Sequence, residues 1–453
     1  MSLRARSKSA AWLRCLALAC ASGGFVPAAG AMDLLQAWQA AVINDAQLRA
    51  ARAAAASNRE RLPQAQAQLR PQVNLSLQRS RNDLNSESAG PLGRPVQDQL
   101  VYTSAADSLT VRQPIYRPQL RAQVRVARAL VENGEAVLQQ EEQRLAMRVT
   151  QAYFEALLAE EQLRLVGVQQ AATTAQLEAA RKGFAGGSGT RTDIEEAQAR
   201  LDLNFAQELE ARQAVEFTRR QLAQIVGQPV AQLAPVDAER LPLAMPQPAL
   251  LEDWLARART ASPELRAAAA NVEAARQAVE RARANHLPTL DALAQVVRSD
   301  SDNPTRVDTR YTQKAIGLQL NVPIYQGGLV DSQVRQALAD VERSESVLEA
   351  TRLDLEARVF REFRGVGEGI ARIRALEQAV RSAEQLVRSS RRSQQGGSRS
   401  VLDVLNAEQQ LGSAQRDLAQ ARFAYLLSLV RLRALAGEWQ DASLAQVNGW
   451  LRP

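Results

Sequence analysis

Two short Gly/Ser-rich stretches of this 453-residue chain carry the side chains best suited to reversible polar chemistry. The first is GGSGTRTDI, residues 186–194, and the second is GGSRSVLDV, residues 396–404. Within them, TRTD at 190–193 and SVLD at 400–403 are capping-box patterns, in which a hydroxyl and a carboxylate bind the free N–H groups that open a helix. Arg399 stands directly before the second box. These residue types predict helix capping and ion pairing.

The sequence contains no constellation that would catalyse a reaction or bind a cofactor. Its one histidine, His286, lies beside Pro288 at a junction between elements and is interpreted as a structural residue. Gly365, Gly367 and Gly369 do not follow a predicted strand, so they do not form a nucleotide-binding loop. They are expected to loosen the helix that contains them. We therefore predict that the chain is not an enzyme and binds no cofactor.

Residues 1–31 are predicted to be a secretory signal. Basic residues precede an apolar run that ends in Ala29-Gly30-Ala31, and cleavage after Ala31 is expected. Both cysteines, Cys15 and Cys20, lie in this segment, so the mature chain is expected to have no thiol and no disulfide. Acylation of Cys20 is the alternative, although Ala17 stands where such sites usually carry Leu.

The charge balance gives no support for nucleic-acid binding. The signal contains four of the 56 basic residues and no acidic residue, which leaves 52 basic against 49 acidic residues in the mature chain. A net charge of about +3 does not predict a nucleic-acid partner. No mature segment has 18 consecutive apolar residues, so no transmembrane helix is expected.

The mature chain contains an internal duplication, in which matching segments lie about 210 residues apart. LLQAW at 34–38 returns as LLEDW at 250–254, and the first Gly/Ser-rich stretch returns as the second. Pro-Ile-Tyr also occurs twice, with Tyr116 and Tyr325 at its ends. We therefore divide the chain into repeats at 32–240 and 241–453, joined by a proline-rich connector at 230–248.

Each repeat is predicted to hold the same elements in the same order. A helix of about 24 residues is followed by a strand pair, a proline-free helix of about 64 residues, a Gly/Ser turn and a returning helix of about 37 residues. Because the two shorter helices together match the long one, they are expected to stack end to end beside it. In the first repeat the ranges are 46–69, about 72–114, 119–182, 183–189 and 190–226; in the second they are 263–286, about 289–324, 329–393, 394–399 and 400–436, before a C-terminal tail.

The predicted strands alternate strictly between apolar and polar residues, as in VNLSLQ at 73–78 and IGLQLNVPI at 316–324. This period suits a half-buried strand of a soluble hairpin, and it equally suits an outer-membrane strand with lipid on one side and a lumen on the other. Prolines mark the junctions of strand and helix, where neither hydrogen-bond ladder can continue. They are Pro71, Pro114, Pro288 and Pro323.

Four strands cannot close a barrel, and an open sheet edge in lipid leaves backbone groups unpaired. The chain is therefore expected to borrow strands from copies of itself, and three copies would supply twelve strands with cyclic symmetry. Tyr116 and Tyr325 would lie at the inner membrane interface, and Tyr102 and Tyr311 near the outer one. The polar segments 81–101 and 299–311 would join strands outside the cell.

With the duplicated order, the proline-bounded strand pairs and the two Gly/Ser turns, the sequence resembles the TolC family of outer-membrane efflux and secretion channels over residues 33–445. The resemblance implies a mainly α fold with a small β part. It implies a homotrimer whose twelve-stranded barrel lies in outer-membrane lipid and continues as a helical coiled-coil tunnel across the periplasm. It also implies a periplasmic membrane-fusion adaptor and an inner-membrane ABC exporter or other pump as partners.

The resemblance also assigns roles at the tip of the tunnel. Arg399 matches an arginine that holds the closed state by binding a Thr-Asp pair, here Thr192 and Asp193. Asp403 matches a ring of acidic residues that narrows the pore, whereas Asn406 stands where a second acidic ring occurs and Gln394 replaces a tyrosine that assists the lock. The turns with Gly186, Gly187, Gly396 and Gly397 match the region that docks the adaptor.

Three alternatives stay open at the level of the sequence. Asp193 and Asp403 could each act in helix capping as well as in gating, since each is the last residue of a capping-box pattern. The chain as a whole could instead be a soluble periplasmic coiled-coil adaptor or scaffold. The cargo, either secreted protein such as a toxin or small molecules, is not encoded by the polar groups of a pore, although the weak acylation site favours secretion.

Overall fold

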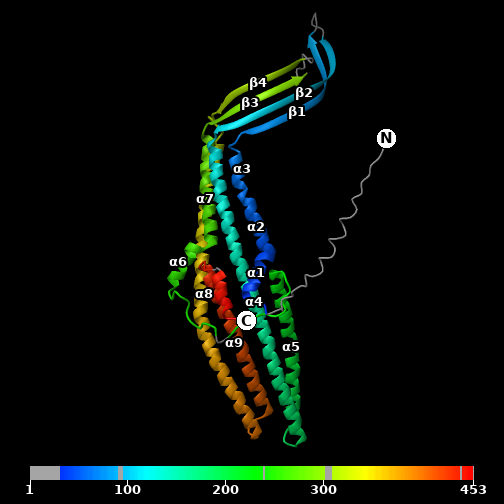
Figure 1. Cartoon of the computed structure of the whole chain (residues 1–453), viewed down its shortest axis with the longest axis vertical. Helices are drawn as coiled ribbons and strands as arrows, with labels where there is room; N and C mark the ends of the chain where they lie inside the picture. The colour runs from blue at the N-terminus through cyan, green and yellow to red at the C-terminus, as the bar shows by residue number, and fades with distance from the viewer. Residues whose placement is uncertain (1–30, 90–94, 238–239, 301–308, 439–440, 452–453) are drawn as a thin grey trace, which may run out of the picture.

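Four antiparallel strands at one end of the molecule continue into a bundle of long helices in the computed structural model (Figure 1). The structure describes residues 31–89, 95–237, 240–300, 309–438 and 441–451. The predicted signal, including Cys20, lies outside the described residues apart from Ala31. Within the described residues, no helix is both long and apolar enough to cross a membrane.

The strands form one sheet in the order β1-β2-β3-β4. Their bounds are β1 Gln72–Ala89, β2 Pro95–Tyr116, β3 Thr289–Asp300 and β4 Arg310–Asn321. The register places apolar residues opposite one another across the whole sheet: Val73 faces Val111, which faces Ala294, which faces Ile316. Polar residues alternate with them, so that Asn74, Thr110 and Gln295 form the next row. The sheet therefore has one apolar and one mainly polar face.

The strands of the first pair are longer than the sequence predicted. The segment 81–101, expected to be a surface connection, is mostly strand, because polar residues there continue the ladder from Arg81 opposite Thr103 to Ala89 opposite Pro95. Polar side chains are compatible with a ladder since its hydrogen bonds come from the backbone. Pro114 also does not end β2: the register shifts between Pro114 and Tyr116, and this irregularity accommodates the missing N–H.

The helices follow the repeated order. The first repeat has α1 Leu34–Asn44, α2 Ala46–Arg59, α3 Arg61–Ala67, α4 Pro118–Ala185 and α5 Arg191–Val226. The second has α6 Leu251–Ala261, α7 Pro263–Arg283, the 3-10 turn η2 Ala284–His286, α8 Leu329–Gln395 and α9 Val401–Leu435, followed by α10 Asp441–Asn448. The single helix expected at 46–69 is two helices separated at Glu60, and α1 and α6 precede the helices that the sequence predicted.

The shorter helices stack beside the long ones, as expected from their lengths (Figure 1). In the first repeat α2, α3 and α5 pack on α4, and in the second α7 and α9 pack on α8. The two repeats are joined through α4, which also packs on α7 and α9. Both hairpin turns, α4–α5 and α8–α9, lie at the end of the molecule far from the sheet (Figure 1).

The main core lies where the connector crosses the middle of the bundle. Tyr153 of α4 is fully buried, and its hydroxyl, which has one proton to donate, lies 3.0 Å from the carbonyl oxygens of both Met32 and Ala234. Tyr425 of α9 likewise donates to the carbonyl of Pro242. Burial raises the pKa of both phenols, so they remain neutral donors. The two tyrosines therefore hold the connector against the long helices.

The glycines of α8 do not loosen this helix, which is continuous from Leu329 to Gln395. A Cβ atom at Gly369 would lie 3.2 Å from Cβ of Tyr425, and one at Gly365 would lie 2.9 Å from Oγ of Ser428. Both glycines face α9. They therefore allow the close approach of α8 and α9, which is a packing role that a glycine-rich helix does not reveal by its sequence alone.

Candidate functional site at the hairpin tips

The two tip turns have the same backbone geometry. Gly187 and Gly397 have φ angles of 77° and 74°, the left-handed conformation that favours glycine. In both turns the serine after this glycine donates its backbone N–H to a carbonyl near the end of the long helix. Ser188 donates to Gly183 and Ser398 donates to Ser393, each with an N–O distance of 2.9 Å. The chain therefore reverses direction within a few residues at each tip, and the second helix of each hairpin begins directly afterwards.

Both predicted capping boxes are present. Oγ1 of Thr190 accepts from the N–H of Asp193 at 3.1 Å, and the Asp193 carboxylate accepts from the N–H of Thr190 at 2.9 Å. The second box has the matching distances of 3.2 Å and 3.0 Å between Ser400 and Asp403. The Ser400 hydroxyl also donates to Asp403 at 2.8 Å. Both carboxylates therefore cap the N-terminus of a helix, whatever further role they have.

The electrostatics of Asp403 follow from this cap. The hydroxyl and then the N–H of Ser400 hold the pKa of the exposed Asp403 carboxyl below its usual value, with a smaller contribution from the charge of Arg399. The side chain remains charged and reaches solvent. A carboxylate on the tip surface can attract a cation in solution, which is the property that a selective constriction requires.

The structure does not bring Arg399 to Thr192 and Asp193 within one chain. The guanidinium of Arg399 instead donates to Oγ of Ser390 at 2.5 Å. Ser390 is fully buried in the last turns of α8, so this contact ties the tip turn to its own hairpin. A contact with the Thr-Asp pair would have to reach across to another hairpin.

Asn406 is brought to a residue that the sequence reasoning missed. Nη2 of Arg200 on α5 donates to Oδ1 of Asn406 on α9 at 3.0 Å, and Nη1 donates to Oε1 of Gln409. Beneath these contacts a small hydrophobic cluster joins the hairpins, formed by Leu177, Ala197, Leu201, Val401 and Leu405 with Ile194. The sequence offered one signal for this contact: Arg200 and Gln409 are 209 residues apart, so they occupy nearly equivalent positions in the two repeats.

Buried polar contacts stiffen the hairpins above the tips. Arg391 of α8 donates to Glu408 of α9 at 2.7 Å, and the Glu408 side chain is 8% exposed. In the first hairpin, Asn204 of α5 donates to Oγ1 of Thr173 on α4 at 2.9 Å. Each hairpin therefore has its own internal tie, and the Arg200 bridge described above connects one hairpin to the other.

Comparison with known proteins places this architecture in a family. The family model described as "Outer membrane efflux protein" matches residues 37–228 and 254–438, one segment within each of the two repeats. The chain belongs to this family. The predicted resemblance to the TolC family is thereby confirmed, and the adaptor alternative is wrong, because the match covers both repeats of a channel protein.

Several curated relatives match nearly the full length of this channel protein. It is 33% identical to the proteases secretion protein PrtF of Dickeya chrysanthemi, over 95% of this chain and 93% of the relative. It is 34% identical to the alkaline protease secretion protein AprF of Pseudomonas aeruginosa, over 92% and 87%. It is 29% identical to the outer membrane protein TolC of Escherichia coli, over 94% and 87%.

Solved structures show the same fold at low sequence identity. CusC, whose structures are described in terms of folding and transmembrane channel formation, aligns with a TM-score of 0.78 at 18% identity, over 89% of this chain and 92% of that one. VceC of Vibrio cholerae aligns with a TM-score of 0.73 at 21% identity, over 89% and 96%. The mainly α fold with a four-stranded sheet is confirmed, and the family is one of outer-membrane channels rather than enzymes.

Proposed function

We propose that the chain is the exit duct for a secreted protein, working as a homotrimer with a periplasmic membrane-fusion adaptor and an inner-membrane ABC exporter. Its outer-membrane channel function follows from its family. The trimer, the partners and the cargo are the further content of the proposal. The observation that carries it is a sheet that is incomplete in a single chain.

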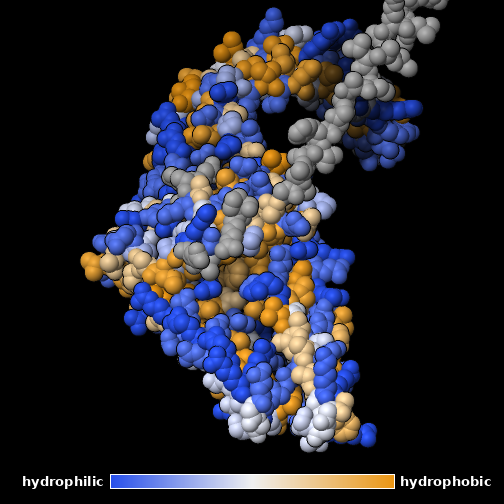
Figure 2. Space-filling view, turned by 60° about the horizontal axis from the view of Figure 1, so that its bottom comes forward, coloured by the Kyte–Doolittle hydropathy of each residue, from blue (hydrophilic) through white to orange (hydrophobic). Residues whose placement is uncertain are grey.

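This sheet has two open edges and an uncovered apolar face. Within the described residues β1 pairs only with β2 and β4 pairs only with β3, which leaves the outer edges of β1 and β4 unpaired. Ile316 and Leu318 on the apolar face are 91% and 69% exposed, and Figure 2 shows hydrophobic residues gathered over the sheet end of the molecule. Lipid against this face and three sheets joined edge to edge would satisfy both requirements.

An exposed face on the helices is a second observation that supports assembly with further copies of the chain. Ala419 and Phe423 of α9 are buried in the chain, where Phe423 packs against Phe154 of α4 with ring centroids 6.0 Å apart. At an offset of 210, the corresponding face of α5 carries Leu209, which is 61% exposed. This face is therefore covered within the chain on α9 of the second repeat, whereas the equivalent face on α5 of the first repeat is exposed. A second copy of the chain would cover it with α8.

At the tips, three chains would bring neighbouring hairpins together. We propose that Arg399 then exchanges Ser390 for Thr192 and Asp193 of an adjacent hairpin and closes the tunnel. Three Asp403 carboxylates would narrow the opening, and Asn406 would form the next level. The exposed turns with Gly186, Gly187, Gly396 and Gly397 would receive the adaptor, because they are the surfaces farthest from the sheet (Figure 1).

The proposal of a protein cargo rests on the relatives. Two that match over most of both chains, PrtF and AprF, are by name protease secretion proteins. The test is complementation of cells that contain a protease exporter and adaptor but lack their exit duct. Active protease in the medium, without leakage of periplasmic enzymes, is the expected result. Retention of the protease inside cells that display the trimer in their outer membranes would contradict a secretion function.

The gate has a separate test in planar bilayers. Arg399→Ser and Asp193→Ala are each expected to raise resting conductance, and the double variant is expected to add little because both remove one contact. An exposed pair contributes only about 0–1 kcal/mol, but three copies can shift a closed–open equilibrium by about 1–3 kcal/mol. Trimers that remain intact with unchanged conductance in both single variants would show that another contact closes the tip.

A further inference from the structure

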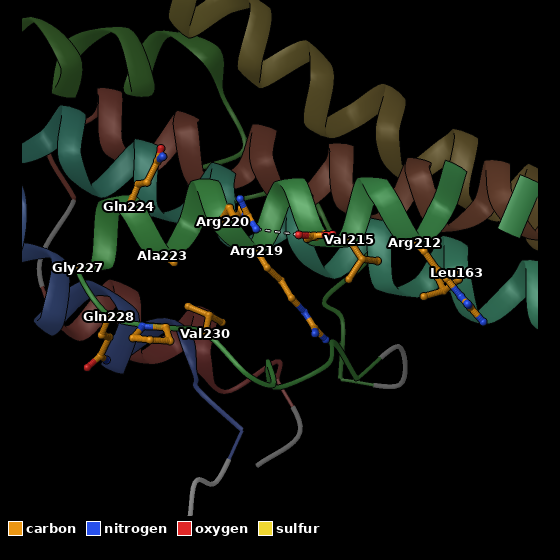
Figure 3. Close-up of a pocket in the computed structure, with 12 residues that line it drawn as sticks. Leu163, Arg212, Val215, Arg219, Arg220, Ala223, Gln224, Gly227, Gln228 and Val230 are labelled. Atoms are coloured by element: carbon orange, nitrogen blue, oxygen red, sulfur yellow. Dashed lines mark hydrogen bonds and ion pairs between the residues drawn. The ribbon is translucent and has the colours of Figure 1, made fainter. Parts of the chain in front are cut away.

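Arg200 differs from the other arginines of α5 in its partners. Arg191, Arg212, Arg219 and Arg220 each pair with a glutamate, respectively Glu195, Glu208, Glu160 and Glu216. Figure 3 shows three of these residues along a groove on the C-terminal half of α5. Arg200 instead donates to the amide oxygens of Asn406 and Gln409, and it has no carboxylate partner among the described residues. Its guanidinium is therefore held by neutral acceptors rather than by an ion pair within these residues.

The backbone on both sides of this bridge is fixed. Leu201 follows Arg200 on α5 and Leu405 precedes Asn406 on α9, and both leucines are buried in the cluster that joins the hairpins. The planar guanidinium can donate to two acceptors at once, and Asn406 and Gln409 offer two oxygens one helical turn apart. One side chain therefore connects the two hairpins in a defined position.

The bridge lies directly above the proposed constriction. Asn406 is three residues after Asp403 on α9, which corresponds to about 4.5 Å along the helix axis. Both residues are exposed. In a trimer, a ring of three carboxylates at Asp403 would thus be followed by three guanidinium groups at the level of Asn406. The charge at this second level would be positive.

We infer that Arg200 is a positioning and specificity-determining residue of the channel, which holds Asn406 and Gln409 against α5 and supplies the positive charge at their level of the tip. The inference rests on the proposed trimeric channel. It predicts that Asp403 alone provides the cation preference, that Arg200 opposes it, and that a carboxylate placed at position 406 would be captured by Arg200.

The first test measures ion selectivity as the reversal potential in a KCl gradient across planar bilayers. Arg200→Gln is expected to raise the permeability ratio of potassium to chloride about two- to five-fold, as fits the loss of one partly exposed charge per chain. Arg200→Lys keeps the charge and is expected to preserve the ratio. Arg191→Gln is the matched control, because Arg191 is an exposed arginine of the same helix whose ion-pair partner, within the part of the chain that the structure describes, is Glu195. Equal ratios for wild type and Arg200→Gln would overturn the inference.

The second test uses hexaamminecobalt(III) as a blocking cation. Asn406→Asp alone is expected to change the blocking concentration less than about two-fold, because Arg200 would bind the new carboxylate. Asn406→Asp with Arg200→Gln would complete a second acidic ring and is expected to strengthen block about ten-fold or more. Equal strengthening by Asn406→Asp alone would show that Arg200 does not occupy this level.

These outcomes separate the inference from the proposal beneath it. Wild-type trimers that form no conducting pore would refute the channel assembly itself. Trimers whose cation preference depends on Asp403 but is indifferent to Arg200 would support the proposed constriction and refute only the role of Arg200.

Discussion

Single residues at the tip cap a helix in the structure and have a second role in the proposed pore. The sequence patterns correctly predicted the capping boxes, because a hydroxyl and a carboxylate three residues apart are a local signal. Arg200 could not be found in this way, since its partners lie 206 and 209 residues away and it has no motif of its own. Local chemistry can be read from sequence, whereas a contact between helices depends on packing.

The cap of Asp403 leads to a pH prediction. Ser400 lowers the pKa of Asp403 in the folded chain, so the charged cap stabilises the helix above the unfolded pKa and loses this contribution as pH falls through the folded pKa. Ser400→Ala removes the largest cause of the shift, and the midpoint for loss of cation block on acidification should move to higher pH. In a trimer, neighbouring carboxylates would raise the pKa of Asp403 equally in the wild type and in Ser400→Ala, so they do not alter this comparison.

The measurement is a titration of cation block in bilayers, with Asp403→Asn as the control in which this titration should vanish. An identical midpoint in wild type and Ser400→Ala would contradict the assigned cause of the shift. A persistent titration in Asp403→Asn would mean that another carboxylate governs block.

At the scale of elements, order and type were predictable, and boundaries were less so. The helices ended near their Gly/Ser turns because glycine accepts the left-handed conformation that stops a helix. The first strand pair was predicted too short because its polar outer half lacks the alternation that marked the inner half. Pro114 was expected to end β2, but a register irregularity accommodates it. Strand ends are set by pairing, which is a property of two strands rather than one.

Two neighbouring glycines of α8 test whether close packing or helix propensity dominates. Gly367→Ala places Cβ at an ordinary 3.5 Å from Sδ of Met245, so the gain in propensity of about 1 kcal/mol should stabilise the fold. Gly369→Ala places Cβ 3.2 Å from Cβ of Tyr425, a side chain fixed by burial and by its hydroxyl contact. Overpacking of about 1–3 kcal/mol should there exceed the propensity gain.

Thermal unfolding followed by circular dichroism in detergent distinguishes the two substitutions. The transition is expected to rise for Gly367→Ala and fall for Gly369→Ala. A rise for both would mean that α9 can move away from α8 without cost, and that these glycines are not needed for close packing.

At the scale of the whole molecule, the duplication is the feature with the most predictive power. It anticipated the stacked helices and the four strands, and burial follows it closely: Leu355 and Val359 of α8 are buried, as are Leu145 and Val149 of α4, 210 residues earlier. The two repeats differ where only one of them has a neighbour within the chain. Those differences therefore identify the surfaces on which a second copy would pack.

This reasoning predicts a specific contact between chains. Within one chain, Arg431 of α9 donates to Oε1 of Gln151 on α4 at 3.1 Å. Subtracting 210 from Arg431 gives Gln221 of α5, and adding 210 to Gln151 gives Arg361 of α8. Since the second repeat of one copy should meet the first repeat of the next as the repeats meet within a chain, Arg361 is expected to lie beside Gln221 of a neighbouring copy.

Cysteine pairs test this equivalence directly, because both natural cysteines precede residue 32. Gln221→Cys with Arg361→Cys, treated with a short bismaleimide, should give covalent dimers and trimers on denaturing gels. The matched control is Gln151→Cys with Arg431→Cys, whose cross-link should stay within one chain and give only monomers. If the control reacts while the first pair gives no covalent oligomer, then α8 does not pack on α5 of a second copy, and the open edges of the sheet must be closed by a different arrangement.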